Sequence, residues 1–385
     1  MIKLINSSYR KAAQNINILS GLLFSIFSFV YLYYFQGDVV QALHFSLSEG
    51  KTYYSYLIGA IIATLILLII AKLIRDNIKF DVPYLSLSYF PSFLCLSLIT
   101  DIDYSVYTGN EIMHKWIWLF PLLLLLWWGI KYGLEHFFDM LPEERLTKTH
   151  LFISNLSILV LFAVVPILMS NTNINFHHEL AVEKAIHDKK YKEALHVGYK
   201  SFETSRTLSA LRAYAMSLSD EQGLGNQLFK FPQPYGADGL FFSADSKQVL
   251  RINADSLYQY LGEKPYINES VKAYLDRLYA TQKGTYKVLD YYLSGLLLDK
   301  ELDKFSAAVE ECFFNEDSLP RYYQEALILQ SKLSKVKPTF NLDTLLTNRF
   351  SKFEEEQSKH DKWIKQKNLI RHKFGDTYWW YYYYQ

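Results

Sequence analysis

The sequence contains few cysteines and lacks the short motifs by which many enzymes are recognised. Only two cysteines occur among 385 residues, Cys95 in an apolar segment and Cys312 in a distant polar one, so a disulfide between them is not expected. No glycine-rich phosphate loop, Gly-x-Ser-x-Gly elbow or His-Glu-x-x-His motif is present. The formal net charge of +1 provides no general attraction for nucleic acid. These absences argue against a disulfide scaffold, the commonest hydrolase and nucleotide-binding classes, and a nucleic-acid partner.

Charged residues are also missing from the centres of five long apolar runs in the first half of the chain. A helix needs about 20 residues to cross the roughly 30 Å hydrocarbon core of a bilayer. Ion-coupled transport generally uses ionisable groups inside the membrane, so the uncharged centres disfavour a coupled transporter. The third run is the shortest and contains Pro91. The sequence therefore predicts a bilayer-embedded domain at residues 1–170, with spans at Ile16–Phe35, Tyr56–Ile74, Tyr84–Ile99, Trp116–Tyr132 and Leu151–Met169.

The basic residues between these runs are distributed unequally. Cytoplasmic loops of membrane proteins carry an excess of Lys and Arg. The bias predicts a cytoplasmic N-terminus, and five spans then place the chain after about residue 170 outside the cytoplasm. If the third run did not cross, the second half would return to the cytoplasm. The loops on the N-terminal side contain Lys3, Arg10, Lys11, Lys72, Arg75, Lys79, Lys131, Arg145 and Lys148, against Lys51 and Lys115 on the other.

The second half of the chain follows a helical period. Apolar residues recur about every 3.6 positions from His177 onward, and a last helix is predicted at about Leu342–Gln366. Tyr191-Lys-Glu-Ala194 has the aromatic-x-x-Ala spacing of the turn between tetratricopeptide-like helices. One helix pair cannot bury its apolar face, so such pairs stack and leave a concave surface for ligands. The predicted fold class is all-α: a five-helix transmembrane bundle, a tetratricopeptide-like α-solenoid at residues 171–373, and an aromatic tail at 374–385.

Four short runs in the second half are similar to sequences of a known family. They resemble an uncharacterised family of Bacteroidetes inner-membrane proteins, in which tetratricopeptide-like helices follow several membrane spans. The resemblance implies a location in the bacterial inner (cytoplasmic) membrane, with the C-terminal domain in the periplasm. The family has no established activity, so the resemblance implies architecture and location only. The runs are Gln227-Leu-Phe-Lys-Phe-Pro232, Leu257-Tyr-Gln-Tyr-Leu-Gly262, Leu319-Pro-Arg-Tyr-Tyr-Gln-Glu-Ala-Leu327 and Phe374-Gly-Asp-Thr-Tyr-Trp379.

Two groups of polar residues near the membrane boundary are candidates for chemistry. The first lies in an outer loop and could serve a membrane enzyme or a lipid- or glycan-handling site; it consists of Asp101, Asp103, Glu111 and His114. The second has the i, i+4 spacing that places metal ligands on one helix face; it consists of His177, His178, Glu179, Glu183 and His187. Solvated polar residues beside a membrane explain the second group more simply. The sequence thus predicts no catalytic residue, cofactor or metal site.

Aromatic residues make up 17% of the chain, with 31 tyrosines, and they are densest at its end. Such a run favours a strand, a buried seam or the membrane interface. Three placements stay open: a cap on the solenoid, contact with lipid headgroups, or contact with a partner. Further upstream, Arg321 can pair with Glu325 while Tyr322 and Tyr323 pack between helices, or this helix can contact a partner. The candidate partner-binding residues are Arg321, Tyr322, Tyr323, Tyr378, Trp379, Trp380 and Tyr381.

The leading functional hypothesis is a non-enzymatic membrane protein whose periplasmic helical-repeat domain binds or organises another protein. It is motivated by a stacked-helix surface without a recognisable catalytic constellation. The alternative is a membrane enzyme or lipid- or glycan-handling protein with its site at the outer face of the membrane domain.

Overall fold

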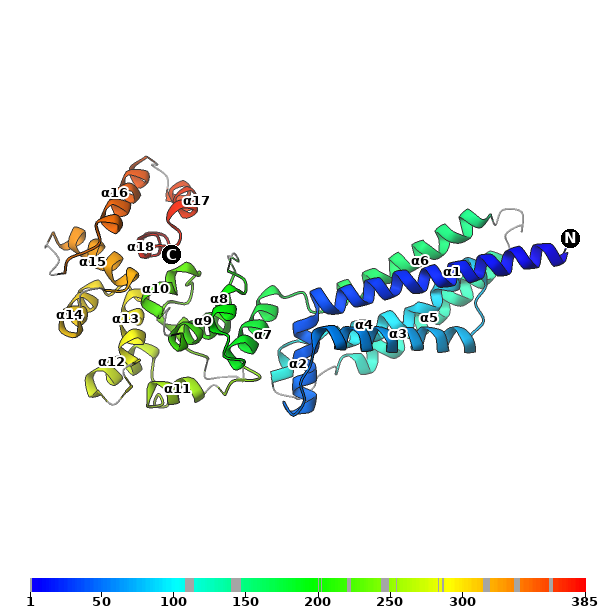
Figure 1. Ribbon diagram of the computed structural model, residues 1–385, viewed down its shortest axis with the longest axis horizontal. Coiled ribbons are helices and arrows are strands. Elements are labelled where there is room, and N and C mark those ends of the chain that lie inside the picture. Colours follow the sequence, from blue (N-terminus) through cyan, green and yellow to red (C-terminus); the bar gives the residue numbers. More distant parts are fainter. Residues whose placement is uncertain are drawn as a thin grey trace. The chain divides into compact units, whose positions relative to one another are not determined.

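The computed structural model describes residues 2–107, 114–139, 147–199, 201, 203–219, 223–243, 249–253, 255–282, 284–285, 287–313, 319–335, 340–359 and 363–385. Within these ranges every regular element is helical, which confirms the all-α class (Figure 1). The chain divides into two compact units, Met1–His177 and His178–Gln385.

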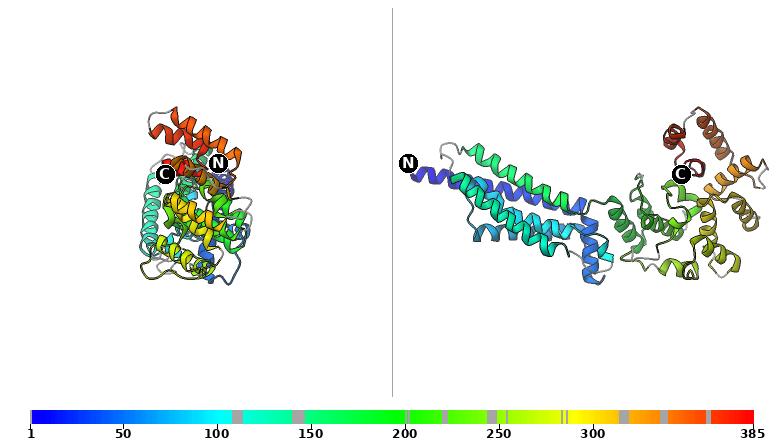
Figure 2. Two further views of the ribbon diagram at one scale, coloured as in Figure 1. Left: turned by 90° about the vertical axis from the view of Figure 1, so that its left-hand side faces the viewer. Right: turned by 180° about the vertical axis from the view of Figure 1, so that it is seen from behind.

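The first unit consists of long apolar helices that run side by side (Figure 2). Five of its segments are long and apolar enough to cross a membrane, as the sequence predicts: Ala13–Phe35, Tyr56–Asn77, Val82–Thr100, Trp116–Phe137 and Lys148–Met169. Its elements are α1 (Ile2–Val30), the π-helical turn η1 (Tyr31–Phe35), α2 (Gly37–Ser48), α3 (Tyr56–Asn77), the 3-10 segment η2 (Val82–Tyr89), α4 (Phe90–Thr100), the 3-10 turn η3 (Tyr104–Tyr107), α5 (Trp116–Asp139), α6 (Lys148–Met169) and the start of α7 (Ile174–His187).

The connection between the first two spans is not the plain loop that the sequence suggests. The N–H of Gln36 donates to the carbonyl of Tyr31 at 3.0 Å, closing the wider turn of a π-helix. A further helix, α2, follows at once and buries Val39, Ala42 and Leu43. Glu49 ends it in the left-handed conformation. This helix escaped prediction because its apolar face is short and follows directly on a longer apolar run.

The third span occupies the centre of the bundle. In its apolar stretch 78% of the residues are buried, whereas in the other four spans only 11–28% are, and many apolar side chains point outward. The first eight residues, Val82–Tyr89, form a 3-10 segment, and the last 11, Phe90–Thr100, form α4. The 3-10 part is kinked at Tyr84 (φ −131°, ψ 30°). At about 2 Å per residue for this part and 1.5 Å for the α part, the segment therefore extends at most roughly 32 Å, close to the thickness of the hydrocarbon core.

Polar side chains of neighbouring helices complete the hydrogen bonds of this irregular segment. Asn155 of α6 donates to the carbonyl of Val82 at 2.6 Å and accepts from the N–H of Ser86 at 2.7 Å. The hydroxyl of Ser154 donates to the carbonyl of Pro83 at 2.8 Å. Because a bilayer offers no such partners, non-α backbone inside it must be satisfied by protein.

The second unit contains shorter helices, and neighbours in the sequence pack against each other from α12 to α18. Side chains fix several helix starts: Ser205 accepts from the N–H of Leu208 at 3.0 Å, and Thr377 accepts from that of Trp380 at 3.2 Å. The elements after α7 are α8 (Tyr191–His196), α9 (Arg206–Leu218), α10 (Leu224–Gln227), the 3-10 turns η5 (Leu228–Lys230) and η6 (Gly236–Leu240), α11 (Asp255–Leu261), α12 (Val271–Thr281), α13 (Val288–Leu298), α14 (Leu302–Cys312), α15 (Arg321–Ser334), α16 (Thr344–Ser358), α17 (Trp363–Phe374) and α18 (Tyr378–Tyr384).

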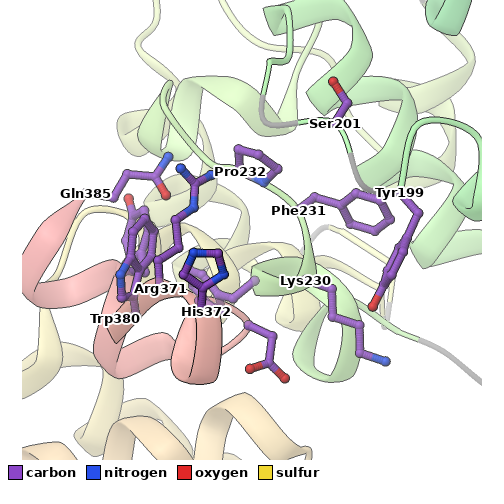
Figure 3. Close-up of a pocket in the computed structure, with 13 residues that line it drawn as sticks. Tyr199, Ser201, Lys230, Phe231, Pro232, Arg371, His372, Trp380 and Gln385 are labelled. Carbon is purple, nitrogen blue, oxygen red and sulfur yellow. The ribbon is translucent and has the colours of Figure 1, made fainter. Parts of the chain in front are cut away.

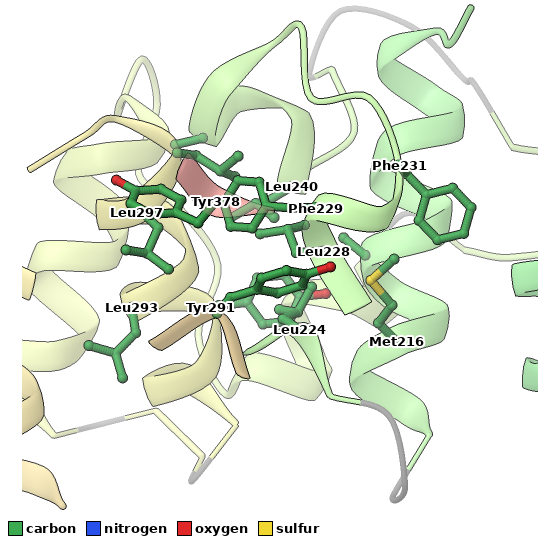
Figure 4. Packing of buried hydrophobic residues seen from close by; sticks show 14 of the residues in the cluster. Met216, Leu224, Leu228, Phe229, Phe231, Leu240, Tyr291, Leu293, Leu297 and Tyr378 are labelled. Atoms are coloured by element: carbon green, nitrogen blue, oxygen red, sulfur yellow. The ribbon is translucent and has the colours of Figure 1, made fainter. Parts of the chain in front are cut away.

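One hydrophobic core connects the early and late helices of the second unit (Figure 4). Helix α13 lies inside it and is apolar around most of its circumference, with Tyr291, Leu293 and Leu297 buried. Phe229 and Tyr378 reach the same core from η5 and α18. The end of the chain is therefore part of this core.

Two sequence expectations for the end of the chain are wrong. The single last helix expected at Leu342–Gln366 is instead two helices, α16 and α17. The aromatic tail, for which a strand was one expectation, is helix α18. In a helix, positions three and four apart share a face, so Tyr378 and Tyr381 can contact the same core residues.

Candidate functional site

A pocket of about 490 Å³ lies in the second unit, where η5 and the following loop face α17 and α18 (Figure 3). We call it the basic–aromatic pocket. It combines cationic and aromatic side chains with few acidic ones. Its lining residues are Tyr199, Ser201, Phe229, Lys230, Phe231, Pro232, Arg371, His372, Gly375, Asp376, Trp380, Tyr381 and Gln385.

The inner wall is held by a cluster of aromatic rings around Phe229. Its ring centroid lies 5.0 Å from that of Tyr322, 5.1 Å from Tyr378 and 4.9 Å from Tyr381, in edge-on or tilted arrangements. The hydroxyl of Tyr381 donates to the carbonyl of Leu298 at 2.6 Å. These contacts join α13, α15, α18 and η5 into one wall.

A buried carboxylate aligns the start of α18. Glu325 of α15 is completely buried, accepts from the N–H of Tyr378 at 2.7 Å and pairs with Arg321 at 2.8 Å. The indole N–H of Trp379 donates to the carbonyl of the same Glu325 at 2.7 Å. Burial raises the pKa of Glu325 to about 7, although the charge of Arg321 opposes the shift.

Asp376 stands at the pocket edge between two arginines. It accepts from Arg321 at 3.0 Å and from Arg349 at 2.7 Å. Burial acts to raise the pKa of Asp376, but these two positive charges hold it below the ordinary value. The negative charge of Asp376 is thus shared between these two arginines, and two further cations line the pocket.

Those cations are Lys230 and Arg371, with His372 exposed beside them (Figure 3). Burial and then the charge of Arg321 lower the pKa of Lys230, and burial lowers that of Arg371. Within the part of the chain that the structure describes, Lys230 has no ion-pair partner. The guanidinium of Arg371 lies 5.2 Å from the ring centroid of Trp380, a cation–π distance.

A buried arginine adds positive charge behind the wall. The guanidinium of Arg212 stacks 4.6 Å from the ring centroid of Phe231, and Arg212 is only 2% exposed. It donates to the carbonyls of Val197 and Gly198, while Nε and Nη1 have no hydrogen-bond partner among the described residues. Burial lowers its pKa to about 10, so it remains charged at neutral pH. The pocket therefore suits an anionic group beside an aromatic or aliphatic one.

The structure brings the candidate partner-binding residues together but turns most of them inward. The predicted i, i+4 pair of Arg321 and Glu325 is confirmed. Of the seven candidates, only Trp380 and Tyr381 line the pocket. Composition alone gave no sign of Lys230, Tyr199 or Arg371 as pocket residues, because they meet only through the fold. The buried candidates are Tyr322, Tyr323, Tyr378, Trp379, Trp380 and Tyr381.

Two groups of polar residues near the membrane boundary were candidates for chemistry. Within neither group do the described side chains converge on a common centre. Asp101 accepts from Lys115 at 2.8 Å and from the indole of Trp116 at 2.7 Å, and Asp103 accepts from the N–H of Ser105 at 2.9 Å. Glu111 lies outside the described residues, and His114 is exposed.

The carboxylates of the second group are occupied by local structure. Glu183 is buried and accepts from the backbone N–H of Leu250, Arg251 and Ile252. Glu179 accepts from the hydroxyl of Ser205. Among the described residues, no three His, Cys, Asp or Glu side chains are grouped so that they could hold a metal ion.

Five apolar helices long enough to cross a membrane, followed by a unit of shorter helices, define the class of a candidate multi-span membrane protein. Residues 263–385 match a family of unknown function, DUF6057. No curated protein and no solved structure matches the chain. The match is to an uncharacterised family, as expected, but its description names neither Bacteroidetes nor tetratricopeptide-like helices. It covers α17 and α18 but not the pocket residues from Tyr199 to Pro232.

Proposed function

We propose that this protein is a membrane-anchored adaptor. The first unit holds it in the bilayer, and the second binds an acidic segment of a partner protein through the basic–aromatic pocket. The observation that carries the proposal is the presence of Lys230 and Arg371 in one pocket whose only acidic side chain, within the described lining, is paired with two arginines.

The chemistry of the pocket favours a protein segment over a simple anion. Carboxylates of the partner would neutralise Lys230 and Arg371, while an apolar or aromatic side chain would lie against Trp380 and Phe231. Aromatic and arginine side chains are also the types most enriched at interface hot spots. Tyr199, which is 48% exposed, offers further contact area at the rim.

The membrane location and orientation are part of the proposal. The excess of Lys and Arg in alternate loops supports a cytoplasmic N-terminus, which with five spans puts the second unit in the periplasm of a bacterial inner membrane. The sequential packing of helices from α12 onward supports a tetratricopeptide-like stack. In this proposal, the partner is a periplasmic protein or the periplasmic part of another membrane protein.

Site-specific crosslinking in native membranes tests the proposal. A photoreactive amino acid at Tyr199 is expected to crosslink one partner through a contact peptide rich in Asp and Glu, identified by mass spectrometry. Lys230→Glu is expected to weaken this complex by about tenfold or more, because it places like charges together.

The matched control is Lys352→Glu on α16, an exposed lysine outside the pocket lining. It makes the same change in net charge and is expected to leave crosslinking unchanged. If Lys352→Glu and Lys230→Glu had equal effects, or the contact peptide lacked acidic residues, the assignment of the pocket would be wrong.

A further inference from the structure

A second cavity, of about 770 Å³, lies within the first unit beside the π-helical turn. Its volume falls in the range of roughly 300–1,000 Å³ that is typical of small-molecule sites. It is formed by the last turns of α1, by η1, and by the segment that follows the end of α6. We call it the π-turn groove.

One end of the groove is apolar and belongs to a membrane span. Leu23, Ile26, Phe27 and Val30 line it, and all four lie in the span Ala13–Phe35. Ile26 is 53% exposed and Val30 37% exposed, so this wall is open to the surroundings of the bundle. In a bilayer those surroundings are acyl chains, which match such a wall in polarity.

The other end is polar and rich in hydrogen-bond acceptors. Asp38 lines it, accepts from the hydroxyl of Tyr56 at 2.7 Å, and has no cationic partner among the described residues. The side-chain N–H of Gln36 donates to the carbonyl of Asn171 at 3.3 Å, which identifies its nitrogen and leaves Oε1 as an acceptor. Gln36 is 3% exposed, and Oε1 has no hydrogen-bond partner.

The hydroxyl of Tyr31 fixes this end of the groove. It donates to the carbonyl of Pro166 in α6 at 3.0 Å and accepts from Gln36 at 3.4 Å. The π-helical turn thus holds Gln36 and the start of α2 in place beside α6. A carboxylate without a cation and a buried amide oxygen without a donor together favour a ligand that carries a positively charged N–H group.

We propose that the π-turn groove binds one membrane lipid with a primary ammonium headgroup, of the phosphatidylethanolamine class. The acyl chain lies along Leu23, Ile26 and Val30. The ammonium donates to the carboxylate of Asp38 and, after a small movement of the side chain, to Oε1 of Gln36. A choline headgroup has the same charge but no N–H donor, so it satisfies neither acceptor. Phosphatidylglycerol is anionic and is therefore repelled by the negative charge of Asp38.

Lipid retention by the full chain tests this proposal. The protein is purified in mild detergent, equilibrated with an equimolar mixture of phosphatidylethanolamine and phosphatidylcholine, and examined by native mass spectrometry. The expected result is one retained lipid with a preference of about tenfold for phosphatidylethanolamine, the effect of one charge-assisted hydrogen bond. Asp38→Asn removes the preference, and Val30→Trp fills the groove and removes the retained lipid.

Two matched variants separate the groove from general effects. Asp76→Asn changes an exposed aspartate of α3 that is not part of the groove, and Leu122→Trp adds a ring at a 62% exposed position of α5. Both are expected to behave like the wild type. Retention of no lipid, retention without headgroup preference, or equal losses in Asp76→Asn and Asp38→Asn would each overturn the proposal.

Discussion

Arg321 is the residue on which the end of the chain depends most directly. Its guanidinium binds Glu325 one turn away on α15 and Asp376 in the turn before α18. At pH values above about 7, where Glu325 is ionised, removing Arg321 would leave it buried without its countercharge, a change that commonly costs about 3–5 kcal/mol. The pair with Glu325 could be predicted from the spacing in the sequence. The pair with Asp376 joins positions 55 residues apart, so no local sequence pattern predicts it.

The raised pKa of Glu325 makes stability depend on pH in a defined direction. Its folded pKa of about 7 lies above the ordinary value of 4.5, so between these pH values the folded chain keeps a proton that the unfolded chain has released. The stabilisation is complete below about pH 4.5 and is lost as pH rises through 7. The gap corresponds to about 3 kcal/mol. The lowered pKa of Asp376 acts in the opposite sense, but only below its ordinary 3.8.

We therefore expect the free energy of unfolding of the second unit to fall between pH 5 and 8, and Glu325→Gln to flatten this dependence. Calorimetric unfolding of the full chain in mild detergent at several pH values measures it. Glu354→Gln, at a partly exposed carboxylate paired with Lys332, serves as the control and should retain the slope. An unchanged slope in Glu325→Gln would show that another group titrates.

Two tyrosines of α18 differ in what their hydroxyl groups contact. Tyr381 donates to the carbonyl of Leu298 at 2.6 Å, whereas the buried hydroxyl of Tyr378 has no partner among the described residues. Tyr381→Phe is expected to destabilise the second unit by about 1 kcal/mol, and Tyr378→Phe to leave it unchanged or stabilise it by up to about 1 kcal/mol. Denaturant midpoints followed by tryptophan fluorescence can distinguish them, because Trp379 and Trp380 are buried in the same helix. Equal losses in the two variants would contradict the assignment.

At the scale of elements, the five apolar runs were predictable and the structure of the third was not. Length and hydropathy suffice to find a span, and all five recur in the structure. The 3-10 geometry of Val82–Tyr89 depends on hydrogen bonds from Asn155 and Ser154, two polar residues inside an apolar run that carry no pattern of their own. The pairing of helices in the second half was visible as a period, but the break between α16 and α17 was not.

Asn155 should therefore matter more than its position in an apolar helix suggests. Asn155→Leu leaves the carbonyl of Val82 and the N–H of Ser86 without their partner, and a buried unsatisfied group costs about 1–3 kcal/mol. We expect a loss of about 3 kcal/mol or more, seen as a lower melting temperature and a smaller monodisperse fraction in fluorescence-detected size-exclusion chromatography. Asn77→Leu, at the exposed end of α3, is the matched control. If both variants melted alike, the backbone of η2 would not depend on Asn155.

For the whole molecule, the number of spans decides on which side of the membrane each unit lies. An odd number puts the N-terminus and the second unit on opposite sides, and the third segment decides between four and five. Its central position and its length of 19 residues favour five. With five spans, the excess of Lys and Arg predicts that the second unit lies outside the cytoplasm, as proposed above.

The two native cysteines provide the test without engineered residues. Cys312 is exposed at the end of α14, whereas Cys95 is half-buried inside the third span. A membrane-impermeant maleimide applied to intact spheroplasts is expected to label the protein, and Cys312→Ser to abolish the labelling, while Cys95→Ser leaves it unchanged. Labelling that required permeabilised membranes would place the second unit in the cytoplasm. A cytoplasmic second unit would require an even number of spans or the opposite orientation, and it would move the partner of the basic–aromatic pocket to the cytoplasm.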